Sequence, residues 1–147
     1  MIPMFQTFFS SSETYKKISP AEMQTILKTP EKYIMIHTLT SEYQDYVIPG
    51  TVQDTREESV INEMLNRIDI PDKPIIVYGK NVRDETPVTK ANQLKSLGIR
   101  EISIYSGGMF EWLLLNEVYG PTEFPVKVQT DHYHHQPQKM HDIWKYQ

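Results

Sequence analysis

The chain has 147 residues, of which 39% are apolar and 23% charged, and this length and composition suit one globular domain with its own core. The formal net charge of −4 and the absence of a basic run argue against a nucleic-acid partner, because phosphate binding needs a basic face. The chain contains no cysteine, which excludes disulfides, cysteine-ligated zinc and every thiolate mechanism.

Residues 1–17 are predicted to form an N-terminal arm. The segment is apolar, but it has no basic region at its start and polar residues interrupt it, so it does not resemble a signal peptide. No apolar stretch of the chain approaches the ~20 residues of a membrane span. We therefore expect a soluble, intracellular and cytoplasmic protein without a membrane partner. Three phenylalanines in the arm could pack on the domain or on a partner: Phe5, Phe8 and Phe9.

The first helix and the first buried strand follow the arm. Ser19 is a capping residue with Pro20 at the first helical position, and the apolar residues after it share one helical face up to Thr29. The apolar run 33–36 is short and continuous, which is typical of a strand buried on both faces.

The middle of the chain is predicted to hold a turn, a second helix and two strands. The turn is at 48–50 and is followed by a short strand at 51–53. Thr55 is predicted to cap the second helix, because apolar residues recur at helical spacing over 60–68. The run 75–78, Ile-Ile-Val-Tyr, carries the strongest strand signal in the sequence.

A polar loop over 79–85 leads into the third helix. Thr86 is predicted to cap this helix with Pro87 at its first position, and Gly98 is predicted to end it. The run 102–105 is another strand.

The last predicted helix covers 109–118 and is nearly all apolar, so we expect it to be buried. Strands alternate with helices through the whole chain, which predicts an α/β domain with a mainly parallel sheet covered on both faces. The domain is expected to span 18–121, and the polar segment 122–147 is interpreted as a C-terminal tail.

Four segments carry a resemblance to a known family. They are Ile-Pro-Gly-Thr-Val at 48–52, Pro-Ile-Ile-Val-Tyr at 74–78, Leu-Lys-Ser-Leu-Gly-Ile at 94–99 and Tyr-Ser-Gly-Gly-Met-Phe-Glu-Trp at 105–112. In this order and at this spacing they resemble the rhodanese-like domain family over about 18–121. The resemblance implies a three-layer α/β sandwich whose mainly parallel central sheet has about five strands.

Three positions depart from the pattern of that family. The family's nucleophilic cysteine follows the tyrosine of the strand, and Gly79 stands at that position. The family's Asp-x-Arg is replaced by His-Thr-Leu at 37–39, and its histidine before Ile-Pro-Gly is replaced by Val47. Because sulfur transfer needs a thiolate, the resemblance implies a catalytically inactive member that is not an enzyme and needs no cofactor.

The loop after the third strand remains a candidate binding site. Backbone N–H groups at a helix N-terminus favour anions, while Asp84 and Glu85 oppose an anion if they face inward. Two interpretations stay open. The loop is either a binding site for an anion or an acidic peptide, or a solvated charged turn without a ligand. The candidate residues of the loop are Gly79, Lys80, Asn81, Arg83 and Thr86.

The histidines offer a second candidate. His132, His134 and His135 lie close together in the tail and could bind zinc, nickel or copper, but no helix or strand is predicted to hold them in a frame. We therefore expect no dedicated metal site. His37 is expected to be a hydrogen-bonded structural histidine.

The sequence thus predicts a non-catalytic protein-binding or scaffold module whose partner is another protein. Two alternatives remain, a small-anion sensor at the loop and a non-thiol enzyme of another class on the same fold. Trp112, four residues after Gly108, is expected to be the buried anchor of the domain.

Overall fold

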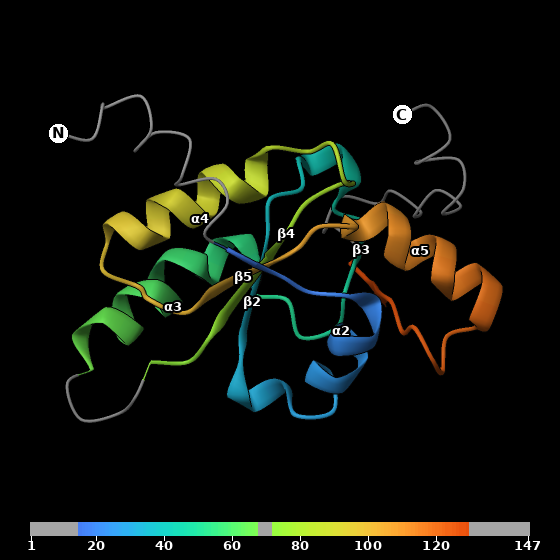
Figure 1. The fold of residues 1–147 in the computed structure, drawn as a ribbon, viewed down its shortest axis with the longest axis horizontal. Coiled ribbons are helices and arrows are strands. Elements are labelled where there is room, and N and C mark those ends of the chain that lie inside the picture. The colour runs from blue at the N-terminus through green and yellow to red at the C-terminus, as the bar shows by residue number, and fades with distance from the viewer. Residues whose placement is uncertain (1–14, 68–71, 130–147) are drawn as a thin grey trace, which may run out of the picture.

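The computed structural model describes residues 15–67 and 72–129, and its centre is a sheet of four parallel strands (Figure 1). The predicted arm up to residue 14 and the histidines of the tail lie outside the described residues. The strands, in their order across the sheet, are β1 (Lys16–Lys17), β5 (Ile102–Tyr105), β4 (Ile75–Tyr78) and β2 (Ile34–His37).

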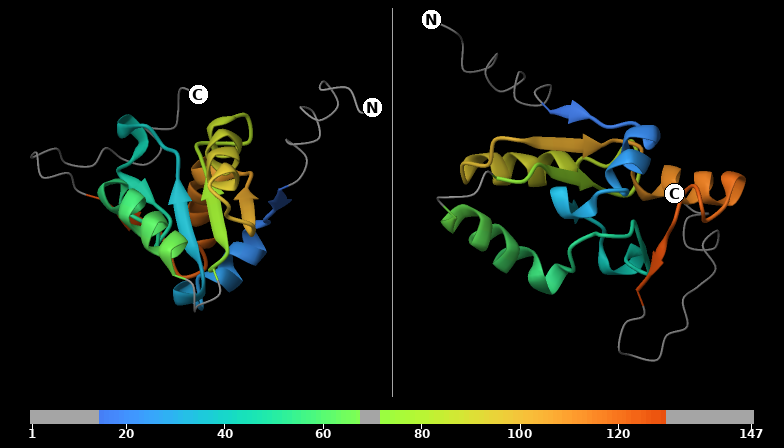
Figure 2. Two further views of the ribbon diagram at one scale, coloured as in Figure 1. Left: turned by 90° about the vertical axis from the view of Figure 1, so that its left-hand side faces the viewer. Right: turned by 90° about the horizontal axis from the view of Figure 1, so that it is seen from below.

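Two pairs of helices cover the two faces of this sheet (Figure 2). On one face, α3 (Asp54–Asn66) and α4 (Thr86–Ser96) pack against the sheet, and on the other face α2 (Pro20–Ile26) and α5 (Gly108–Tyr119) do so. Parallel neighbours need crossover connections, which the helices supply. The predicted three-layer α/β sandwich is therefore confirmed, with four strands where about five were expected.

The strands β2 and β4 are buried on both faces because their apolar runs are continuous. Ile75 pairs with Ile34 on one side and Ile102 on the other, and these side chains belong to the core under α3 and α4. The next residue of β4, Ile76, belongs to the opposite core under α2 and α5. The expected strand at 51–53 is only a single bridge between Thr51 and Met35.

Shorter elements complete the fold. A second, two-stranded sheet joins residues that are about eighty positions apart in the sequence. In this sheet β3 (Tyr46–Val47) pairs antiparallel with β6 (Lys127–Val128). The other short elements are two 3-10 helices, η2 (Pro30–Lys32) and η3 (Ser41–Tyr43).

The helix starts were predicted with mixed success. Ser19 caps α2 as predicted, since its Oγ accepts a hydrogen bond from the Glu22 N–H at 3.2 Å. The prediction of Thr55 as a cap is wrong, because α3 already begins at Asp54. Thr86 is not the cap of α4 either: it is the first helical residue, and the Asp84 carboxylate accepts its N–H.

The packed structure extends beyond both predicted boundaries of the domain. At the N-terminal side, Lys16–Lys17 already pair with β5. At the C-terminal side, Phe124 is buried and its ring lies 5.0 Å from that of Trp112, which also donates its indole N–H to the Pro125 carbonyl at 2.8 Å. Two-residue strands carry no periodic signal, so the sequence pattern stops short at residues 18 and 121.

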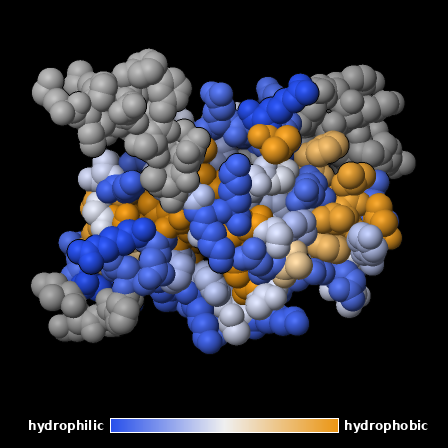
Figure 3. All heavy atoms as spheres, viewed as in Figure 1, coloured by the Kyte–Doolittle hydropathy of each residue, from blue (hydrophilic) through white to orange (hydrophobic). Residues whose placement is uncertain are grey.

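Helix α5 is not buried on all sides, contrary to the expectation. Met109, Trp112 and Leu113 face the core, whereas Phe110 and Leu114 are exposed. A helix that packs on one face of a sheet buries only one of its own faces. Figure 3 shows hydrophobic residues at the surface over α5. No described helix combines the length and apolar character that crossing a bilayer requires.

Candidate functional site

The candidate loop lies at the carboxyl end of the sheet, where ligands commonly bind in α/β folds. Gly79 follows β4, Thr38 follows β2, and Gly107 and Gly108 follow β5. Since the strands are parallel, these ends meet at the same edge of the sheet. The loop is therefore built from three strand ends that are far apart in the sequence.

The carboxylate of Asp84 fills the centre of this loop. Its Oδ2 accepts the backbone N–H of Lys80 at 2.9 Å, and its Oδ1 accepts the N–H and the hydroxyl of Thr86 at 2.9 and 2.7 Å. Partial burial on its own raises the pKa of the Asp84 carboxyl, but these hydrogen bonds and the nearby Lys80 ammonium outweigh burial and hold the pKa below its usual value. The loop thus carries its own bound anion.

Gly79 leaves no room for a side chain beside that carboxylate. A Cβ placed on Gly79 would lie 2.3 Å from Asp84 Oδ2, 2.7 Å from Pro87 Cγ and 2.9 Å from Thr38 Oγ1. All three distances are shorter than real Cβ contacts. The position that carries the nucleophile in the resembling family is therefore empty of a side chain and also enclosed by its neighbours.

The start of α5 closes the loop from the other side. The N–H groups of Met109 and Phe110 donate to the carbonyls of Gly79 and Lys80, both at 2.9 Å. This approach requires Gly108, which has a φ of +68° and whose Cβ would lie 2.7 Å from the Gly79 carbonyl oxygen. The first N–H groups of α5 are thus bound to the loop backbone.

The polar residues predicted for the loop point to different partners. The Lys80 ammonium lies over the Tyr43 ring, 4.0 Å from its centroid, as in a cation–π contact. The Asn81 side chain accepts the Arg83 N–H at 3.0 Å, and Arg83 itself is exposed. The Thr86 hydroxyl lies 2.8 Å from that of Thr38.

Asp84 is the central residue of this loop, and the sequence analysis left its orientation open. An aspartate side chain commonly accepts the backbone N–H two residues further on, in an Asx-turn, and this spacing is the sequence signal that points to its role. No sequence pattern indicates that Thr38 belongs to the loop. It lies next to Gly79 only because β2, which precedes it, pairs with β4.

His37 is a buried histidine with both ring nitrogens bonded. Its Nδ1 accepts the Leu39 N–H at 3.1 Å, and its Nε2 lies 2.8 Å from Asp54 Oδ1. Burial lowers the pKa of His37, although Asp54 and Glu57 favour the charged form. The ring is therefore neutral at pH 7, with its proton on Nε2 toward Asp54, which agrees with the predicted structural role.

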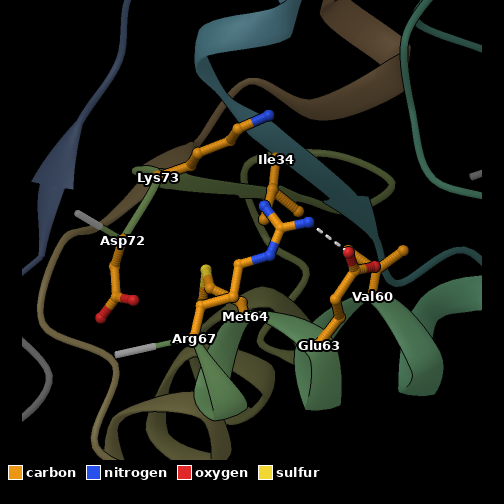
Figure 4. A pocket seen from close by; sticks show the side chains of 7 residues that line it. All are labelled: Ile34, Val60, Glu63, Met64, Arg67, Asp72 and Lys73. Atoms are coloured by element: carbon orange, nitrogen blue, oxygen red, sulfur yellow. Dashed lines mark hydrogen bonds and ion pairs between the residues drawn. The ribbon is translucent and has the colours of Figure 1, made fainter. Parts of the chain in front are cut away.

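Outside the loop, the described residues form a surface pocket and hold no cluster of metal ligands. No group of three or more metal-ligating side chains occurs among residues 15–67 and 72–129, and His132, His134 and His135 lie outside them. A pocket of about 170 Å³ lies at the opposite end of β2 from the loop. Figure 4 shows Arg67 directed toward Glu63 across its rim, and these two residues form an ion pair. Its lining residues are Ile34, Val60, Glu63, Met64, Arg67, Asp72 and Lys73.

The sequence of this domain matches a known protein family. The model of the rhodanese-like domain matches residues 20–115. The chain belongs to the rhodanese-like domain family. This rhodanese-like domain has no match among curated proteins.

Several solved structures share the fold of this rhodanese-like domain. The Alr3790 protein from Anabaena sp. is 20% identical, with a TM-score of 0.53 over 74% of this chain and 78% of that one. A single-domain sulfurtransferase from Saccharomyces cerevisiae is 19% identical, with a TM-score of 0.50 over 71% and 94%. A protein from Rhodopseudomonas palustris, named a possible tyrosine phosphatase, is 16% identical, with a TM-score of 0.53 over 76% and 87%. At these identities the likeness concerns the fold alone.

Proposed function

We propose that this rhodanese-like domain is a non-catalytic module that binds another protein. The observation that carries the proposal is the closed loop, in which Gly79 offers no nucleophile and the Asp84 carboxylate occupies the space beside it. Sulfur transfer through a persulfide needs a thiolate to accept the sulfur atom, and the chain has no cysteine.

Two alternatives meet the same obstacle, which is the Asp84 carboxylate in the loop. One is an anion sensor, and the other is a phosphatase, an activity that the name of one structural neighbour suggests. A phosphate or sulfate at the loop needs the N–H groups of Lys80 and Thr86, which Asp84 already holds. The negative charge of Asp84 also repels an incoming anion. A ligand there would first have to displace a tethered carboxylate.

A surface suited to a protein partner begins beside this loop. Phe110, Leu114 and Val118 are 42%, 51% and 66% exposed, and their spacing of four residues puts them on one side of α5. The stripe is about 12 Å long at the helical rise of 1.5 Å per residue. Contiguous exposed apolar residues of this kind mark interaction surfaces, and the neighbouring exposed Glu117 favours a partner with a basic residue opposite it.

The catalytic half of the proposal is tested with the purified 147-residue chain. Sulfur transfer from thiosulfate to cyanide should proceed at the rate of the buffer blank. Gly79→Cys should remain inactive, since its Cβ collides with Asp84. Turnover by the unaltered chain above the blank would refute this half.

The binding half uses two matched leucine substitutions on different faces. Leu114 on α5 and Leu65 on α3 are 51% and 38% exposed. Proteins captured from cells of the source by the unaltered chain should be lost with Leu114→Glu and kept with Leu65→Glu. A purified partner should then bind Leu114→Glu at least tenfold more weakly, about 1.4 kcal/mol. Equal binding to both variants contradicts the assignment to α5.

A further inference from the structure

A second surface lies on the opposite face of the sheet, in the groove between α3 and α4. We propose that this groove binds an amphipathic basic segment of a partner protein, with apolar side chains on its floor and a lysine or arginine over its carboxylates. The site is independent of the loop and of α5. It would therefore be a second binding site of the module.

The helices α3 and α4 cover one face of the sheet (Figure 2), and side chains from both line the groove. It encloses about 410 Å³, which is within the size range of ligand sites. The Lys90 ammonium on α4 and Glu57 on α3 are 2.7 Å apart, so an ion pair bridges the groove at one end. Its lining residues are Asp54, Glu57, Glu58, Ile61, Asn62, Lys90, Gln93, Leu94 and Leu97.

The two ends of the groove differ in character. Asp54, Glu57 and Glu58 stand at the start of α3, whereas Leu94 and Leu97 stand at the end of α4. Because α3 and α4 each lie in a crossover between parallel strands, β2 to β4 and β4 to β5, they run in similar directions, and one end of the groove is acidic and the other apolar. Leu97 is 55% exposed at this apolar end, which leaves it accessible to a partner.

The acidic end carries negative charge that the described residues leave uncompensated. The Lys90 ammonium neutralises the charge of Glu57. The Asp54 carboxylate accepts hydrogen bonds from His37, which is neutral at pH 7, and from the side-chain amide of Gln44, each at 2.8 Å. Glu58 is exposed and has no ion pair or hydrogen bond among the described residues. Two carboxylates therefore face the groove without a cation, and charge complementarity favours a lysine or arginine of the partner.

These features limit the class of the ligand. Uncompensated carboxylates repel nucleic acid and other phosphate ligands. The apolar end favours leucine-like side chains, and the amides of Asn62 and Gln93 supply hydrogen bonds along the rim. From Asp54 to Asn62 the groove is about 12 Å long, which suits two turns of a helix.

The test is an NMR titration of the full chain, labelled with ¹⁵N, with two synthetic helical peptides. One peptide combines leucines on one face with lysines, and the other has the same leucines with glutamates. The lysine peptide should shift amide signals along α3 and α4 and bind at least tenfold more tightly than the glutamate peptide. Its affinity should fall between 50 and 300 mM NaCl, because a surface ion pair is screened by salt.

Three variants decide where the peptide binds. Leu97→Glu and Glu58→Lys should each weaken the lysine peptide at least tenfold, and Glu58→Lys should improve binding of the glutamate peptide. Leu114→Glu on α5 should leave both affinities unchanged, which separates this site from the surface of the proposed function. Signals that shift mainly on α5, or equal affinity for the two peptides, would overturn the inference.

Discussion

Replacing Gly79 with alanine should destabilise the domain, and it should do so mainly through Asp84. The new methyl group would lie 2.3 Å from Asp84 Oδ2, so the carboxylate must leave its position. It would then lose its hydrogen bonds from Lys80 and Thr86. The two positions are therefore coupled, and a double-mutant cycle measures that coupling.

The expected magnitudes follow from the contacts. Overpacking in a filled site costs about 1–3 kcal/mol, and loss of side-chain hydrogen bonds to the first residue of a helix costs about 1 kcal/mol. Gly79→Ala should therefore cost about 2–4 kcal/mol, and Asp84→Ala about 1 kcal/mol. In the double variant the carboxylate is absent, and only the contacts with Pro87 and Thr38 remain. Its cost should be at least about 1 kcal/mol smaller than the sum of the single costs.

Urea unfolding followed by circular dichroism supplies the four free energies of unfolding. Gly98→Ala is the matched control, because Gly98 has a φ of +101° but nothing within 4 Å of an added Cβ. Its cost comes from backbone strain alone and should add to that of Asp84→Ala. If Gly79→Ala and Asp84→Ala also add within about 0.5 kcal/mol, the carboxylate does not occupy the space beside Gly79.

Three further predictions concern the core. Burial holds the pKa of His37 below its ordinary value, so as the pH falls below about 6.5 the imidazole binds a proton in the unfolded chain before it does so in the folded one. The free energy of unfolding in urea should therefore decrease from pH 7.5 to 5.5, and it should decrease by less in His37→Gln. Trp112→Phe should lower that free energy by about 1–3 kcal/mol, because the Pro125 carbonyl loses its donor, and an unchanged urea midpoint would contradict the packing. A chain ending at residue 121 should unfold at least about 2 kcal/mol more easily than one ending at 129, since it lacks Phe124; equal melting curves would restore the shorter boundary.

Much of the fold followed from local patterns. Strands β2, β4 and β5 were predicted within one residue of their ends, because continuous apolar runs of about four residues indicate buried parallel strands. The order of four short segments identified the family that the comparisons confirmed. The absence of cysteine by itself excluded every thiolate mechanism.

The tertiary structure decided what local patterns do not encode. A helix that is nearly all apolar, such as α5, does not reveal which of its faces the sheet will cover. The two-residue strands β1 and β6 exist only because their partners lie nearby in space. The charge of Asp84 was visible in the sequence, but its position was not, because the backbone N–H groups that hold it are oriented by the turn between β4 and α4.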